Sequence, residues 1–312
     1  MNNRTEAIMQ KTLVVWLGAM LCCALWGSAF PCIKLGYAWS GIAADDTAAQ
    51  ILYAGVRFTL AGILTVLIGS LAARKPLLPT KQSLPMAAGL SLLQTVLQYL
   101  FFYIGLAHTS GVKASIIEGV NVFVAILVSS LLFRMEKFTL RKLIGCLIGF
   151  AGLVLVNVSG SSLGGGLALN GEGFIFLSTV AYAFSSVMLK RLSARFHPVM
   201  LSGWQFIIGG LVMAAAGLLL GGRVRLDSAA AVGMLFWLAF VSAAAYSLWG
   251  ILLKYNPVSR VAVFGFMNPV FGVILSSVLL SEGSSIGLAA IISLVLVCAG
   301  IYIVNAAGKK AE

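Results

Sequence analysis

The stretch Asn121-Val-Phe-Val-Ala-Ile-Leu-Val-Ser-Ser130 recurs in altered form as Asn268-Pro-Val-Phe-Gly-Val-Ile-Leu-Ser-Ser277. Both stretches are apolar, begin with an asparagine and end with a pair of serines. A second match joins Ala151-Gly-Leu-Val-Leu-Val-Asn157 to Ala299-Gly-Ile-Tyr-Ile-Val-Asn305 at nearly the same offset. Nearly the same offset also aligns Tyr99 with Tyr246 and Arg57-Phe58 with Gln205-Phe206. The common order of these matches indicates that the chain consists of two similar halves.

The composition around these stretches is that of a membrane protein. Of the 312 residues, 60% are apolar and only 10% are charged, and the mean hydropathy is +1.03. A soluble domain carries about 25% charged residues. This composition excludes an ordinary cytosolic enzyme, a secreted disulfide scaffold and a disordered regulator, and it predicts an all-α integral membrane protein.

Apolar runs long enough to span a bilayer, about 20 residues each, occur ten times. We therefore predict ten transmembrane helices, over roughly these ranges: 13–35, 48–71, 84–106, 111–133, 141–158, 172–192, 198–220, 229–251, 258–280 and 286–305.

Each half holds five of these spans, and an odd number forces the second half to enter the membrane from the opposite side. The sequence thus predicts two inverted-topology five-helix repeats, 1–158 and 172–312, joined by a linker over 159–171. Inverted repeats are typical of secondary transporters, in which two similar halves expose a central site to each side in turn. The chain contains no nucleotide-binding P-loop pattern, so ATP hydrolysis by this chain is not indicated.

The distribution of basic residues predicts the orientation. With the N-terminus inside, 16 Lys and Arg fall on inner segments, 4 on outer segments and 1, Arg57, within a span, which accounts for all 21. The positive-inside rule then places both termini in the cytoplasm. The same rule explains the net charge of +12, so we expect no nucleic-acid partner. A cell (inner or plasma) membrane is the expected location.

Several motifs resemble the EamA branch of the drug/metabolite transporter superfamily. They are Ala24-Leu-Trp-Gly-Ser-Ala-Phe-Pro-Cys-Ile-Lys34, Leu131-Leu-Phe-Arg-Met-Glu136, Asn268-Pro-Val-Phe, Leu279-Leu-Ser-Glu282, and the glycines 145, 149 and 152. The resemblance covers nearly the whole chain. It implies ten helices around a central cavity and the carriage, often the export, of small metabolites such as amino acids. One departure is Pro269, which has Val122 as its counterpart in the first half.

Two ionisable residues at mid-membrane depth are the leading candidates for a binding site, because such charges are expensive in a bilayer. Arg57 is expected at roughly 15 Å depth and Glu118 at roughly 12 Å, at 1.5 Å of rise per residue. Arg57 would attract a carboxylate, and Glu118 would bind an ammonium group or couple proton movement to transport. Further substrate-binding candidates at this depth are Trp26, Gln94, Gln98, Tyr99, Asn121, Tyr182, Gln205, Tyr246 and Asn268.

Structural interpretations compete with these roles. Arg57 and Glu118 could form an ion pair that only ties two helices, and the uncharged polar residues could form ordinary interhelical hydrogen bonds. Pro31 and Pro269 lie inside spans and are candidate hinges. The pair Gly145 and Gly149 predicts close helix packing, either between the halves or in a homodimer. Trp16, Trp39, Trp204 and Trp249 lie toward span ends, where an interfacial belt is expected.

These patterns predict a secondary transporter of a small polar or amphipathic, amino-acid-like metabolite, acting as an exporter by alternating access. The alternatives are a multidrug or cation exporter of the same superfamily and a membrane-embedded sensor or enzyme. No catalytic residue, cofactor or metal site is expected. The five cysteines lie in apolar runs without metal-ligand spacing.

Overall fold

The computed structural model describes residues 3–106, 108–109, 111–158, 169–279 and 288–306, and these ranges contain helices and no strand. Glu282 and residues 159–168 of the predicted linker lie outside the described residues. The helix that begins at Leu169 includes the last three residues of that linker.

The first half begins with the short helix α1 (Asn3–Met9) and the long helices α2 (Thr12–Trp39) and α3 (Thr47–Ala73). The next rod is α4 (Ser83–Ser91), the π-helical turn η1 (Leu92–Leu97) and α5 (Gln98–Leu106). After it come α6 (Gly111–Gly119), α7 (Asn121–Leu127) and the π-helical turn η2 (Val128–Leu132), then α8 (Leu140–Val158).

The second half begins with η3 (Leu169–Gly173) and α9 (Phe174–Ser193), followed by α10 (Pro198–Leu219) and α11 (Ala229–Tyr255). The next rod consists of α12 (Val258–Ala262), the 3₁₀ turn η4 (Val263–Phe266) and α13 (Met267–Leu279). The last helix is α14 (Leu288–Ala306).

Six helical segments among the described residues are long and apolar enough to cross a membrane. They are Thr12–Trp39, Thr47–Ala73, Ser83–Leu106, Leu169–Ser193, Pro198–Leu219 and Ala229–Tyr255. The chain is therefore a multi-pass membrane protein. Two of the helices extend four residues beyond the predicted spans: α2 continues past Lys34 to Trp39, and α11 continues to Tyr255.

Side-chain caps fix where two of these helices start. The carboxylate of Asp46 accepts a hydrogen bond from Ala49 N at 2.9 Å at the start of α3. The hydroxyl of Ser228 accepts one from Ala231 N at 3.1 Å at the start of α11. Each cap satisfies a backbone donor that has no partner within the helix.

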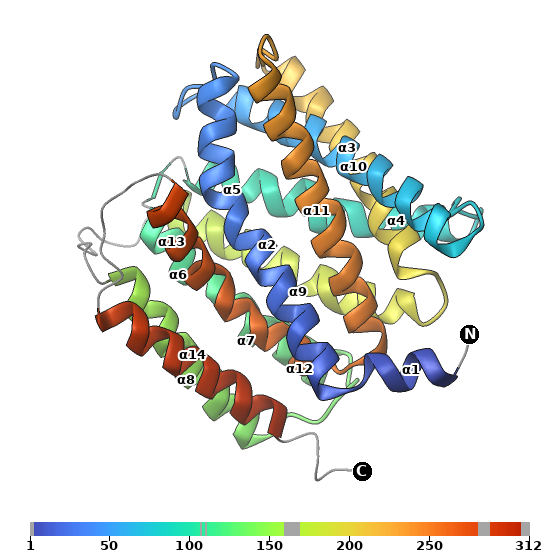
Figure 1. Cartoon of the computed structure of the whole chain (residues 1–312), viewed down its shortest axis with the longest axis vertical. Helices are drawn as coiled ribbons and strands as arrows, with labels where there is room; N and C mark the ends of the chain where they lie inside the picture. Colours follow the sequence, from blue (N-terminus) through green and yellow to red (C-terminus); the bar gives the residue numbers. More distant parts are fainter. Residues whose placement is uncertain (1–2, 107, 110, 159–168, 280–287, 307–312) are drawn as a thin grey trace.

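The helices form two layers between two edge pairs (Figure 1). The pair α3 and α10 forms one edge, and the pair α8 and α14 forms the other. Between them, α2, α11 and α13 lie in front of α5, α7 and α9. We call the end of the bundle where α2 begins the near end, and the end where α2 stops the far end.

The contact between α3 and α10 depends on glycines that leave no room for a side chain. A Cβ on Gly55 would overlap the backbone of Ala214, and one on Gly62 would lie 2.6 Å from Gly203 O. Similarly, a Cβ on Gly210 would overlap the backbone of Thr59. The two backbones therefore touch along much of their length, as small residues permit in membranes.

Glycines also hold α8 against α14. A Cβ on Gly145 would lie 2.8 Å from Gly300 O, and one on Gly300 would lie 2.5 Å from Gly145 O. Gly149 lies against the ring of Phe266. The close packing predicted for Gly145 and Gly149 is thus made between the two halves of this chain.

Two rods are interrupted near their middles. The first breaks at Val120, between α6 and α7, and the second breaks at η4, between α12 and α13. Pro269 lies in the first turn of α13, where its missing N–H is tolerated. The helix α2, in contrast, runs through Pro31 without a break. The hinge roles of both prolines stay predictions.

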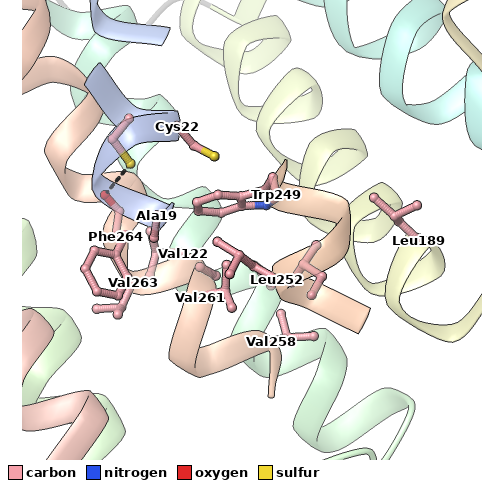
Figure 2. Packing of buried hydrophobic residues seen from close by; sticks show 14 of the residues in the cluster. Ala19, Cys22, Val122, Leu189, Trp249, Leu252, Val258, Val261, Val263 and Phe264 are labelled. Carbon is pink, nitrogen blue, oxygen red and sulfur yellow. Dashed lines mark hydrogen bonds between the residues drawn. The ribbon is translucent and has the colours of Figure 1, made fainter. Parts of the chain in front are cut away.

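The break at η4 is held by the core beside α2. The thiol of Cys23 donates a hydrogen bond to the Phe264 carbonyl oxygen at 3.1 Å (dashed line in Figure 2). Trp249 lies in the same cluster, among Cys22, Val122 and Leu252 (Figure 2), and is only 3% exposed. The interfacial position predicted for Trp249 is therefore wrong, because its ring packs against Trp26 of α2 and the surrounding buried cluster instead of facing lipid.

At the near end, the carboxylate of Glu136 joins the two halves. It accepts hydrogen bonds from Ser129 Oγ at 2.7 Å, Lys142 Nζ at 2.6 Å and Ser259 N at 3.0 Å, and also from the Ser259 hydroxyl. Burial favours the neutral acid, but the hydrogen bonds from Lys142, Ser259 and Ser129 outweigh it and lower the pKa of Glu136. Ser259 belongs to α12, so the carboxylate of Glu136 ties the segment that follows η2 to the start of α12.

The glycine contacts generate a first prediction. Gly55→Ala lowers the thermal stability of the purified protein, because the methyl group forces α3 and α10 apart at a cost of about 1–3 kcal/mol. The matched control is Gly233→Ala in α11, where an added Cβ meets nothing within 4 Å. That control leaves stability unchanged or slightly raised. Equal melting temperatures for the two variants would contradict the packing described.

A second prediction concerns Glu136. Glu136→Gln removes charge-assisted hydrogen bonds and lowers the free energy of unfolding by about 2 kcal/mol. Because the pKa is lower in the folded state, this contribution is complete above the unfolded value of about 4.3 and declines as pH falls through the folded value. Thermal unfolding followed from about pH 6 down to about pH 2.5 therefore shows, below about pH 4.3, an acid loss of stability in wild type that Glu136→Gln lacks. The exposed residue Glu6, substituted by Gln, serves as the control, and a wild-type-like profile for Glu136→Gln contradicts the role.

Candidate functional site

Arg57 is the centre of the candidate site. It is the eleventh residue of α3, and only 4% of it is exposed. Its guanidinium carbon lies 4.4 Å from the centre of the Phe58 ring, within the range of a cation–π interaction. The sequence-predicted depth therefore corresponds to real burial of this charge.

Arg57 makes no ion pair among the described residues. Glu118 forms none either in this part of the chain, and Arg57 Nε has no hydrogen-bond partner there. The structural alternative, an Arg57–Glu118 pair that ties two helices, is therefore absent from this conformation. A buried guanidinium without a carboxylate is costly in a membrane and points to a partner that arrives with a ligand or with water.

Residues that correspond to each other in the two halves meet beside Arg57. The rings of Phe58 and Phe206 stack at 5.2 Å with 5° between their planes. The hydroxyls of Tyr99 and Tyr246 lie 3.3 Å apart and share a hydrogen bond. These two contacts join α3 to α10 and α5 to α11.

Trp26 closes this aromatic wall from α2. Its ring packs edge-on against Tyr246 at 5.1 Å and against Trp249 at 5.0 Å. Its indole N–H is buried and has no hydrogen-bond partner among the described residues. Tyr182 of α9 packs against the same buried cluster as Tyr99 and Tyr246. The structure thus brings five sequence-predicted residues together: Trp26, Arg57, Tyr99, Tyr182 and Tyr246.

Glu118 belongs to α6, which contacts α5, the helix that carries Tyr99. Glu118 is the eighth residue of α6 and is half-buried. Asn121, one turn further, faces the η4 break: a Cβ on Gly265 would lie 3.6 Å from Asn121 Oδ1.

Buried amides form the part of the site nearer to the near end. Gln94 is fully buried in η1, and both its amide nitrogen and its amide oxygen lack partners among the described residues. Gln205 of α10 accepts a hydrogen bond from Thr95 Oγ1 at 2.5 Å, but its Nε2 is unpartnered in the same sense. Only one of these four amide atoms forms the interhelical hydrogen bond that the structural interpretation predicts.

Gln98 and Asn268 complete the predicted set. Each buries an amide oxygen that lacks a hydrogen-bond partner within the described part of the chain. Unpartnered buried polar atoms cost about 1–3 kcal/mol each, and native structures contain few of them. Among the described residues, 7 of the 17 buried side-chain atoms without a partner belong to the candidate residues. A site for a polar ligand or ordered water would produce such atoms.

The sequence reading missed several residues of the site. Phe58 and Phe206 looked like ordinary core residues, although the repeat had already aligned them. Tyr37, Tyr53 and Tyr103 lie close to the far ends of their helices, where an interfacial belt is the default. Nevertheless Tyr53 is 1% exposed and Tyr103 is 6% exposed. The signal that could have found Tyr53 and Tyr103 is their spacing of four residues from Arg57 and from Tyr99, respectively. The sequence offers no such signal for Tyr37.

This arrangement can bind a small amphipathic molecule. The aromatic walls suit an apolar body, Arg57 suits an anionic group, and Glu118 suits a cationic group or a proton. No group of three or more His, Cys, Asp or Glu that could hold a metal occurs in the ranges that the structure describes. The site therefore offers recognition by charge and hydrogen bonds at the contact between the two halves.

Comparisons with known proteins identify relatives over nearly the whole chain. The model of the EamA-like transporter family matches residues 13–158 and 169–306. An uncharacterized transporter of Bacillus subtilis (strain 168), YvbV, is 26% identical over 96% of this chain and 94% of its own length. An uncharacterized transporter of Archaeoglobus fulgidus is 28% identical over 93% and 98%.

One solved structure is similar in fold. A crystal structure of another protein aligns with a TM-score of 0.77, covering 96% of this chain and 98% of that chain. The two sequences are 18% identical. At that identity the likeness shows a shared fold and nothing further.

The unpartnered amide of Gln94 generates a third prediction. Gln94→Leu keeps or raises the melting temperature, because it removes polar atoms that are buried without partners. The matched control is Gln50→Leu, since Gln50 Nε2 donates to Ala43 O at 3.2 Å and Ala44 O at 2.9 Å. That variant loses stability. Equal losses for both variants would show that Gln94 is a structural residue.

Proposed function

Because the chain belongs to the EamA-like transporter family, we propose that it is a secondary transporter that exports a small amphipathic, amino-acid-like metabolite. It is a membrane transporter and not an enzyme. In the proposed mechanism, the ligand's carboxylate binds Arg57, its ammonium group binds Glu118, and its apolar part lies against the aromatic wall. The single observation that carries this proposal is the buried guanidinium of Arg57 without an ion pair among the described residues.

Alternating access needs two similar halves that can exchange conformations. In this proposal ten helices form two inverted repeats, 1–158 and 172–312, with both termini in the cytoplasm. Two observations support the repeats: the family model matches the chain twice, and the corresponding pairs Phe58–Phe206 and Tyr99–Tyr246 touch. A residue can touch its own counterpart only close to the axis that relates the two halves. The site therefore lies where both repeats can reshape it.

Glu118 is the proposed proton-coupling residue. Its carboxylate is half-buried and makes no ion pair among the described residues, so uptake of a proton would remove an expensive charge from the membrane. The same observation favours a second candidate function, export of a cationic drug. Arg57 opposes that alternative, because a cationic ligand would be repelled by a second positive charge in the same site.

Ligand binding by the purified protein is the fourth prediction and the test of the proposed function. L-phenylalanine, L-phenylalaninamide and 3-phenylpropionate carry, respectively, both charges, only the cation and only the anion. L-phenylalanine stabilises wild type by about 2.7 kcal/mol at a hundredfold excess over Kd. Arg57→Gln abolishes the stabilisation by L-phenylalanine and by 3-phenylpropionate. Glu118→Gln weakens the stabilisation by L-phenylalanine and leaves that by 3-phenylpropionate unchanged.

The rival functions give different results in the same thermal-shift assay. Stabilisation by tetraphenylphosphonium and by phenylalaninamide alone, unaffected by Arg57→Gln, would establish a cation exporter. Coupling through Glu118 is checked by uptake into proteoliposomes at several pH values. Transport by Glu118→Gln with an unchanged rate and an unchanged pH profile would eliminate the proton-coupling role.

A further inference from the structure

Three tyrosines from three helices lie on the far-end side of Arg57. They are Tyr37 of α2, Tyr53 of α3 and Tyr103 of α5. The hydroxyls of Tyr37 and Tyr103 are 3.4 Å apart, and the rings of Tyr37 and Tyr53 meet edge-on at 5.5 Å. Tyr53 precedes Arg57 by four residues and so shares its helix face. We call Tyr37, Tyr53 and Tyr103 the outer tyrosines.

The outer tyrosines use little of their hydrogen-bonding capacity. The Tyr53 hydroxyl is buried and has no hydrogen-bond partner among the described residues. It lies against Gly36, where an added Cβ would be only 2.5 Å from the hydroxyl oxygen. The bond between Tyr37 and Tyr103 is at the long limit for an O–H donor. A phenylalanine would fill the same space without the cost of burying a hydroxyl that lacks a hydrogen-bond partner. Packing alone therefore does not explain three hydroxyls at this place.

The outer tyrosines connect to Arg57 through short contacts. Tyr53 lies one helical turn before Arg57, Tyr37 packs edge-on against Tyr53, and the ring centroids of Tyr103 and Tyr99 are 6.4 Å apart. A guanidinium beside phenol groups can offer N–H and O–H donors and a positive charge to an oxyanion. Hydrogen bonds of this charge-assisted kind are the strong ones. The group offers no carboxylate that would compete with an incoming anion.

We propose that the outer tyrosines form an anion subsite between Arg57 and the far end of the bundle. This inference rests on the proposed function and extends it. The ligand's carboxylate is held by Arg57 in the centre and by the three hydroxyls on its way to or from the far end. The subsite takes carboxylates and does not distinguish the cationic part of the ligand.

The test uses the variants Tyr37→Phe, Tyr53→Phe and Tyr103→Phe, each of which removes one hydroxyl and keeps the ring. Binding of L-phenylalanine and of 3-phenylpropionate is measured by isothermal titration in detergent. Because a hydrogen bond to a charged group is lost, the Kd for both carboxylates rises about tenfold in Tyr53→Phe. The control Tyr302→Phe, at a residue of α14 that is 65% exposed, leaves both Kd values unchanged.

A second readout needs no ligand. Tyr53→Phe keeps or raises the melting temperature, because the lost hydroxyl had no partner to lose. A fall of several degrees would show that this hydroxyl is structural and would overturn the subsite.

The binding outcomes separate the two proposals. Unchanged Kd values in all three Phe variants, together with loss of binding in Arg57→Gln, overturn the subsite and leave the proposed function intact. No binding of either carboxylate to wild type overturns the proposed function and the subsite together. A tenfold rise in Kd that occurs only in the variants of the outer tyrosines and of Arg57 supports both the subsite and the proposed function.

Discussion

The backbone contact between α3 and α10 is the constraint on which the rest of the site depends. Glycines on both helices bring the first and second halves to touching distance. At that distance the rings of Phe58 and Phe206 can stack, and Arg57 is buried beside them instead of facing lipid. Any larger residue at these positions would separate the halves and expose the charge. The second glycine contact, between α8 and α14, closes the opposite edge, so the bundle is fixed at both sides while its centre is lined by polar and aromatic groups.

The centre of the bundle buries polar groups that have no partner among the described residues, and its chemistry follows from these groups. A charged guanidinium, unpartnered amide atoms and unpartnered hydroxyls lie together within a chain that is 60% apolar. Such groups weaken a fold, and a purely structural core would use apolar side chains instead. The near end shows the contrast, because the Glu136 side chain there is only 8% exposed but accepts hydrogen bonds from three neighbouring residues. One buried charge is thus fully used by the fold, and the other is left available. We propose that this difference separates a structural clamp, Glu136, from a binding group, Arg57.

Sequence reasoning reached the all-helical membrane fold and selected candidate residues, five of which lie together in the structure, for physical reasons. A span must be apolar, so an arginine or glutamate inside one stands out, and the internal match aligned Tyr99 with Tyr246 before their contact was known. The outer tyrosines and Trp249 were not found, because position along a helix does not reveal which face a neighbouring helix covers. The breaks at Val120 and η4 were only hinted at by Pro269. They depend on contacts such as that of Cys23 with the Phe264 carbonyl, between residues far apart in the chain.

The central claim is that Arg57 binds the negative group of the ligand. Solid-state NMR can measure this directly as dipolar coupling between the ¹³C-labelled carboxylate of bound L-phenylalanine and the ¹⁵N-labelled guanidinium nitrogens of the protein. Lys34 in α2 is exposed, and lysine ¹⁵Nζ labelling therefore supplies a background that the ligand should not contact. The account predicts a carbon–nitrogen distance of about 4 Å, as in a bidentate pair, that disappears in Arg57→Gln. A bound ligand whose carboxylate shows no coupling to any guanidinium would contradict it.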